Sequence, residues 1–259
     1  MFEGEATGEA GTCRLARRGL LAGLLASAAL PAAAAPPRRL RLVPDLPPMP
    51  VVARVLTGAD HGKTLEFRAT GPGAPTGRIT APSWYGGARL EGAVRLADRD
   101  LALLAVEGNT GTGVFQELLL IAGVDDDGLF RILGIETLSA RENNDCAVAE
   151  TLAGRIPAAP GGRALRVRYV GAGTRSDACP ARPGGRRPWR EDWSVTLPWT
   201  GQGVLPPATA TGRTGSVARR LDETRARTAR WLAEAPRRSI TAGDMDRLRL
   251  YDTFSSTPA

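Results

Sequence analysis

Four residues of this chain have the types and spacing needed for acid–base catalysis: Glu117, Glu136, Asp60 and His61. The two glutamates lie on consecutive predicted strands of one hairpin, and a two-residue turn between the strands would place them directly opposite each other. When two carboxylates lie that close, the pKa of one is raised and the pKa of the other is lowered. Many hydrolases use such a pair as their general acid and general base. Because like charges directly opposed destabilise a sheet, we expect a three-residue turn that separates them.

His61 is the single histidine of the chain, and it follows Asp60 in a turn bounded by Gly58 and Gly62. One histidine excludes zinc sites built from several histidines, and a Ser-His-Asp triad would depend on this residue alone. No Gly-x-Ser-x-Gly nucleophile elbow accompanies it. We therefore favour a non-catalytic protein without metal or cofactor. A periplasmic hydrolase that uses the paired carboxylates, or Asp60 and His61, is the alternative.

A second set of candidates could bind a ligand without catalysing a reaction: Trp189, Trp193 and Arg190. Mixtures of tryptophan and arginine stack on sugars or bases. The alternation of Trp193, Val195 and Leu197 also fits the inward face of a last strand, and we favour that interpretation.

The turn of the predicted hairpin is acidic, since residues 125–128 are Asp-Asp-Asp-Gly. The spacing lacks the alternating aspartates and distal glutamate that wrap calcium, so we expect a solvated turn. With the glycine in the left-handed position, Asp125 lies opposite Leu129 and Leu119 lies opposite Ile135. Both faces of the hairpin are then largely apolar, which predicts that it is covered on two sides.

Residues 1–34 have the parts of a cleavable signal peptide. They contain a basic start with Arg17 and Arg18, an apolar stretch at 20–30 and a small-residue cleavage pattern that ends at Ala34. The apolar stretch is shorter than the roughly 20 residues that span a bilayer, so we expect no transmembrane anchor in the mature form. Twin-arginine export and Sec export both stay open.

Cleavage would leave two cysteines, Cys146 and Cys179. An even number of cysteines in an oxidising compartment favours a disulfide, which would stabilise the chain by about 3 to 4 kcal/mol. The segment between them contains no Cys-x-x-Cys pair, so a metal or redox role is disfavoured. The expected location is the bacterial periplasm or the medium.

The elements that position these residues are mainly β. Short segments with β character lie at 51–57, 64–70, 89–96, 101–107, 114–124, 129–139, 165–170 and 193–197. Turns rich in glycine, proline and aspartate separate them, which predicts an antiparallel sandwich or a barrel-like sheet. From Ser216 the period becomes helical and ends before Pro236, and Thr241 could cap a second short helix that reaches Leu250.

This pattern divides the chain into four parts. They are a cleavable signal peptide (1–34), a proline-rich lead-in (35–50), a β-rich domain (51–207) and a C-terminal helical segment (208–259). The fold class is thus mainly β with a C-terminal helical appendage.

The formal net charge is +7, and Lys63 is the single lysine, so the excess of positive charge comes from arginine. A basic surface in the periplasm would adhere weakly to anionic lipid or polysaccharide, in a salt-dependent way. We expect no nucleic-acid partner. The sequence therefore predicts an exported envelope protein with a binding or accessory role toward an envelope ligand or protein. The hydrolase and the adhering basic protein are the alternatives.

Overall fold

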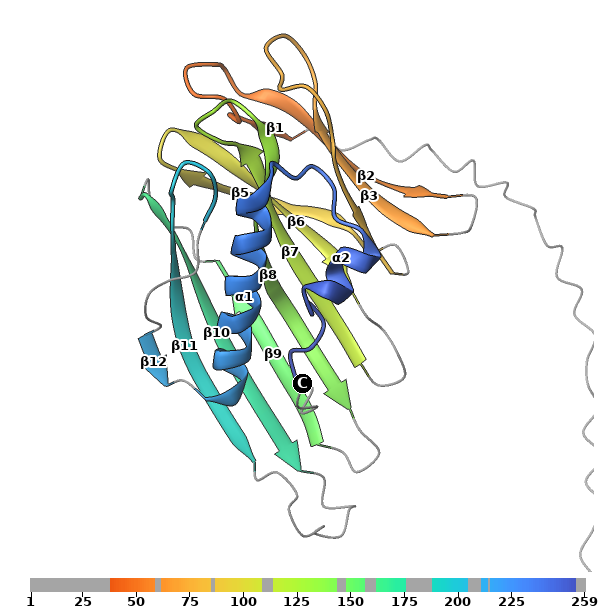
Figure 1. The fold of residues 1–259 in the computed structure, drawn as a ribbon, viewed down its shortest axis with the longest axis vertical. Coiled ribbons are helices and arrows are strands. Elements are labelled where there is room, and N and C mark those ends of the chain that lie inside the picture. Colours follow the sequence, from red (N-terminus) through yellow and green to blue (C-terminus); the bar gives the residue numbers. More distant parts are fainter. Residues whose placement is uncertain are drawn as a thin grey trace, which may run out of the picture. The chain divides into compact units, whose positions relative to one another are not determined.

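The computed structural model describes residues 38–58, 62–84, 87–108, 114–143, 148–156, 162–175, 188–204, 211–213 and 215–254. The chain divides into two units, Met1–Pro36 and Pro37–Ala259, and the described residues all belong to the second. Within them, two antiparallel sheets and two helices form a sandwich-like fold, as the sequence predicts (Figure 1).

Both sheets are meanders, in which each strand pairs with its neighbours in sequence. The smaller sheet contains β1 (Arg39–Leu40), β2 (Met49–Thr57), β3 (Lys63–Ala69) and β4 (Ile79–Pro82). The larger sheet contains β5 (Arg89–Leu96), β6 (Arg99–Glu107), β7 (Val114–Val124), β8 (Phe130–Asn143), β9 (Val148–Arg155), β10 (Ala164–Arg175), β11 (Trp189–Pro198) and β12 (Thr211–Arg213). Each strand predicted from the sequence appears, and β1, β4, β9 and β12 are additional.

The turn between β7 and β8 has the predicted form. The Asp125 amide donates to the Leu129 carbonyl at 3.0 Å, which closes a three-residue turn. Gly128 has φ = 78°, the left-handed region where a side chain is strained. The strands of this hairpin lie in the interior of the larger sheet, and residues 118–122 are buried on both faces, as expected.

The predicted register beyond the turn is wrong by one residue. Leu119 pairs with Glu136 and not with Ile135, because β8 contains an extra residue between the partners of Ile121 and Ala122. Such a β-bulge bends the strand and increases its twist. Hydrophobic alternation does not reveal the bulge, because both neighbouring faces are apolar.

The smaller sheet covers one face of β6, β7 and β8. Its inward side chains, including Phe67 and Ile79, are fully buried, and the Phe67 ring lies 6.0 Å from the Phe130 ring of β8. The expected lead-in takes part as well, since β1 pairs with β2 and the Leu42 side chain is fully buried. Burial at about 25 cal/mol per Å² of apolar surface is the main stabilising term for this layer.

The C-terminal segment supplies α1 (Ser216–Glu234) and α2 (Ala242–Arg247). Helix α1 packs on the larger sheet, over β8 (Figure 1). Its buried residues follow helical spacing: Val217, Ala218, Leu221, Arg225, Thr228, Trp231 and Leu232. Helix α2 begins as predicted, because the Thr241 hydroxyl accepts from the Asp244 amide and the Asp244 carboxylate accepts from the Thr241 amide.

The linker between the helices is hydrogen-bonded to both sheets. The Arg237 carbonyl accepts from the Ile132 amide of β8 at 2.7 Å. One residue later, the Arg238 carbonyl accepts from the Thr80 amide of β4, and the Ile240 amide donates to the Thr80 carbonyl. The linker therefore covers the outer edge of β4, which is otherwise an unpaired strand edge.

We expect Gly154→Ala to destabilise the fold by about 1 to 3 kcal/mol, because overpacking a well-filled interior forces neighbours to move. An added Cβ at Gly154 would lie 2.9 Å from Tyr169 Cε1 and 3.1 Å from the Leu138 carbonyl oxygen. Urea denaturation measures the loss. The matched control is Gly92→Ala on β5, where an added Cβ meets nothing within 4 Å. Equal stabilities of the two variants would contradict the tight packing of β9 against Tyr169.

Candidate functional site

The structure describes some of the candidate residues and not others. Asp60, His61, Cys146 and Cys179 lie outside the described residues, as do residues 1–34. The carboxylate pair and the tryptophan–arginine set lie within them, so their surroundings can be compared with the predictions.

Glu117 and Glu136 do not face each other. A second bulge in β8 places Ser139 opposite Glu117. The Glu117 carboxylate accepts from Arg89 Nη1 at 2.8 Å and from the Ser139 hydroxyl at 2.9 Å. Each glutamate thus has its own arginine, and the geometry needed for a shared proton is missing.

Glu136 lies at the centre of a buried ion-pair cluster. Arg225 Nε of α1 donates to both Glu136 carboxylate oxygens, at 2.8 and 2.9 Å. The Tyr169 hydroxyl of β10 donates to Glu136 Oε2 at 2.5 Å. Arg225 Nη1 forms a further ion pair with Asp222. We call Glu136, Arg225, Tyr169 and Asp222 the ion-pair cluster.

The protonation states in the cluster follow from its burial. Burial raises the pKa of Tyr169 well above its ordinary value of 10.0, and the negative charge of Glu136 raises it further. The Tyr169 phenol therefore stays protonated and acts as a hydrogen-bond donor. Burial acts to lower the pKa of Arg225, but the charge of Glu136 outweighs it, so the pKa is raised. The cluster thus joins α1 to the sheet as a fixed set of charges.

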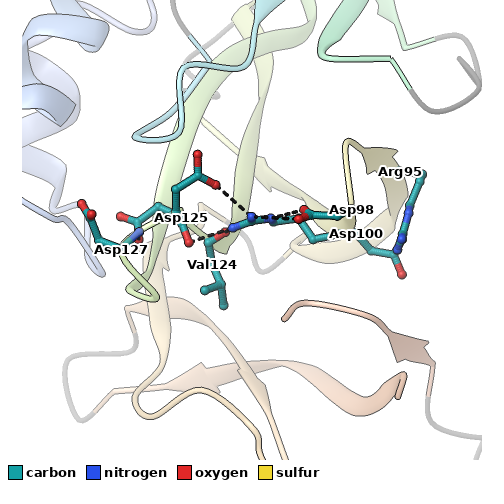
Figure 2. Close-up of polar contacts among 8 residues, drawn as sticks. Arg95, Asp98, Asp100, Val124, Asp125 and Asp127 are labelled. Atoms are coloured by element: carbon teal, nitrogen blue, oxygen red, sulfur yellow. Dashed lines mark hydrogen bonds and ion pairs between the residues drawn. The ribbon is translucent and has the colours of Figure 1, made fainter. Parts of the chain in front are cut away.

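The acidic turn is bound by the side chain of Arg99, and Figure 2 shows the polar contacts that involve Val124, Asp125 and Asp98. Arg99, only 6% exposed, begins β6 and donates through Nη1 to the carbonyls of Val124 (2.9 Å) and Asp125 (2.7 Å). Its Nη2 lies 2.8 Å from Asp126 Oδ1, and its Nε lies 2.8 Å from Asp98 Oδ1. The guanidinium occupies the position at which a cation would have to meet these oxygens.

The Asp125 side chain of the turn is bound by the backbone. Asp125 Oδ1 accepts from the amides of Asp127 (3.1 Å) and Leu129 (2.8 Å). The Asp127 carboxylate points away from Asp98 (Figure 2). Across the described ranges, no group of three or more His, Cys, Asp or Glu side chains is placed to hold a metal ion.

The tryptophan–arginine set is divided between interior and surface. Trp193 is 1% exposed and stacks on Tyr169, with ring centroids 5.2 Å apart. The inward face predicted for Trp193, Val195 and Leu197 is confirmed, since all three are buried. Arg190 is exposed, whereas Trp189 is half-buried over Gly173. Trp193 is therefore part of the core and does not present a face to a ligand.

Two adjoining spaces lie under the C-terminal half of α1. The larger, about 180 Å³, separates the helix from the loop after β11. Its lining residues are Leu133, Thr200, Gln202, Gly203, Val204, Ala229, Leu232 and Ala233. The smaller, about 10 Å³, is lined in part by Glu136, Arg225 and Thr228. Among the described residues, Arg225 Nη2 and Thr228 Oγ1 are buried without a hydrogen-bond partner.

Sequence analysis missed Arg225, Arg99 and Thr228 as parts of a site. Arg225 lies four residues after Leu221 on the apolar stripe of α1, and a charged residue on such a stripe was the available signal. Thr228 is a buried residue of the same helix, but nothing in the sequence indicates that its hydroxyl has no partner. Arg99 carried no signal, because two of its partners are backbone carbonyls and Asp126 meets it only in the folded chain.

No helix of the described residues is long and apolar enough to cross a membrane. In comparisons with protein-family models, curated proteins and solved structures, nothing matches this chain.

We expect Glu136→Gln to destabilise the protein by about 3 kcal/mol, because it leaves the buried Arg225 charge without its main partner. The matched control is Glu117→Gln, whose partner Arg89 is half exposed, with an expected loss of about 1 kcal/mol or less. Unfolding in urea measures both. The triple variant Glu136→Leu, Arg225→Met and Tyr169→Phe should recover most of the loss, since both charges and the buried hydroxyl donor are removed together. Equal losses for the two single variants would contradict a structural role for the cluster.

Proposed function

We propose that this chain is an exported, non-catalytic binding or accessory protein of the bacterial envelope, located in the periplasm or medium after removal of residues 1–34. The proposal that the protein is not an enzyme rests on one observation: the candidate carboxylates Glu117 and Glu136 are separated, and each is bound by its own arginine. A hydrolase would need them close together and open to substrate.

The arrangement of the described elements supports cleavage of the proposed signal. In the part of the chain that the structure describes, the first pairing joins Arg39 to Pro50, five residues after Ala34. Removal of residues 1–34 would therefore leave the described strands of both sheets intact.

The strand register supports the proposed disulfide between Cys146 and Cys179. The last residue of β10, Arg175, pairs with the first residue of β9, Val148. Cys146 precedes Val148 by two positions, and Cys179 follows Arg175 by four. An extended chain spans roughly 3.3 to 3.6 Å per residue, and a disulfide needs Cα atoms about 5.5 to 6 Å apart. These chain lengths are compatible with a bond between the two cysteines, which is what the proposal requires.

The full chain, expressed in a bacterium that has both export routes, should be recovered from the periplasmic fraction with a mass that corresponds to cleavage near Ala34. Intact mass spectrometry after alkylation without reductant should find Cys146 and Cys179 blocked, and native mass spectrometry would show any ligand that remains bound. An uncleaved cytoplasmic protein with free thiols would contradict the export and the disulfide together.

A second candidate function is adhesion to an anionic surface, and the outer face of β10 and β11 favours it. Arg166 and Arg168 are two residues apart on β10, so they share one face, and both are exposed. Arg190 of β11 is exposed as well, and Asp192 is bound to Arg168 at 2.8 Å. Guanidinium groups bind phosphate and carboxylate in a bidentate manner, so this face matches anionic headgroups.

Adhesion predicts that the protein sediments with phosphatidylglycerol vesicles at low salt, that it is released at high salt, and that phosphatidylcholine vesicles do not retain it. Arg166→Gln with Arg168→Gln should weaken binding by roughly 2 kcal/mol, or about thirtyfold, at about 1 kcal/mol per arginine near the surface. Arg230→Gln, at an exposed position of α1, is the control and should have little effect on binding. Retention that is unchanged in high salt would exclude this candidate.

A further inference from the structure

The unpaired polar atoms beside the ion-pair cluster indicate a missing partner. Arg225 is 4% exposed and Thr228 is 2% exposed, yet Arg225 Nη2 and Thr228 Oγ1 have no hydrogen-bond partner among the described residues. A buried donor left without a partner costs about 1 to 3 kcal/mol, and more when it is charged. Both residues line the same small space, so a single hydroxyl group placed there would bind both, as acceptor to Arg225 and donor to Thr228.

The size of the two spaces limits what the partner can be. The smaller space, about 10 Å³, admits one atom of the size of a water oxygen. Val204, Ala229 and Leu232 line both spaces, so the larger one, about 180 Å³, is its direct neighbour. An apolar cavity of about 150 Å³ holds a molecule of the size of benzene.

We propose that these two spaces form a binding site for a small neutral aromatic or aliphatic alcohol. Its apolar body would fill the space between Val204 and Ala229, and its hydroxyl oxygen would accept from Arg225 Nη2. The hydroxyl proton would be donated to Thr228 Oγ1. This inference deepens the binding role proposed above and rests on it for its biological meaning.

Charge favours a neutral ligand over an anion. Arg225 already faces the carboxylates of Glu136 and Asp222, at 2.8 and 2.5 Å. A third carboxylate beside them would add like-charge repulsion in a site without solvent screening. An alcohol adds a hydrogen-bond acceptor without a charge.

The larger space is reached from the surface. Gln202 and Ala233 line it and are both exposed, whereas Leu133 and Leu232 close its inner end. The Thr200 hydroxyl donates its proton to the Gly203 carbonyl at 2.7 Å, so it has no proton to donate to the ligand oxygen. The polar contact of a bound alcohol is therefore expected at Arg225 and Thr228.

The test uses phenol, benzene and benzoate as probes with the full folded chain, and binding is followed by ligand-observed NMR and by the shift in melting temperature. We expect saturable binding of phenol at least about fivefold tighter than that of benzene, which corresponds to one hydrogen bond, and weaker binding of benzoate than of phenol. Ala229→Leu, which fills the larger space, should abolish binding. Ala226→Leu, at a position on α1 that does not line the space, should leave it unchanged.

Thr228→Val is the second variant, and it keeps the side-chain shape while it removes the hydroxyl. It should retain benzene binding and remove most of the preference for phenol. Absence of saturable binding by any probe would overturn the proposal and would indicate an ordered water alone at Arg225. Equal affinity for phenol and benzene, or phenol binding unaffected by both Ala229→Leu and Thr228→Val, would also overturn it. None of these outcomes affects the cleavage and thiol measurements that test export.

Discussion

The ion pair between Arg225 and Glu136 determines where helix α1 lies on the larger sheet. Both charges are buried, and their attraction compensates for the loss of water only when the guanidinium and the carboxylate meet with good geometry. A shift of α1 by one turn would separate Glu136 from its arginine and would leave Arg225 with Asp222 of its own helix as its remaining carboxylate. The start of the helix is held in the same way, since the Glu191 carboxylate of β11 accepts from the Ala218 amide, where the helix dipole favours negative charge. Two carboxylates on the sheet therefore fix the position of the helix, and the apolar contacts of α1 follow from that position.

The high arginine content has a structural use in this fold. Arg99, Arg131 and Arg225 are buried, and each donates to groups that lie far away in sequence. A guanidinium stays charged at any pH that a protein meets, and its planar set of donors can satisfy several carbonyls at once. These properties suit a residue that joins turns and helices across the interior. Part of the basic character is thus buried in the interior, and the arginines of β10 and β11 are among those that stay exposed.

Local chemistry made much of the fold predictable. The turn at 126–128, the cap at Thr241 and the period of α1 depend on neighbouring residues, and all three appear as expected. Strands β4 and β9 were missed because they are short or lack alternation of apolar and polar residues. The bulges of β8 were missed because the alternation of apolar and polar residues along a strand does not show where the strand contains an extra residue. The site around Arg225 was missed for a different reason: its groups come from β8, β10 and α1, and only the folded chain brings them together.

The linker at 237–240 has a consequence for how the molecule is made. Its backbone completes the hydrogen bonding of β4 and of β8, yet it is synthesised after all the strands of both sheets. A nascent chain that leaves the ribosome with its N-terminus first therefore holds both sheets without this connection until residues 237–240 emerge. The edge of β4 stays open to other chains during that interval. The same open edge would be a binding site for chaperones that shield unpaired strands.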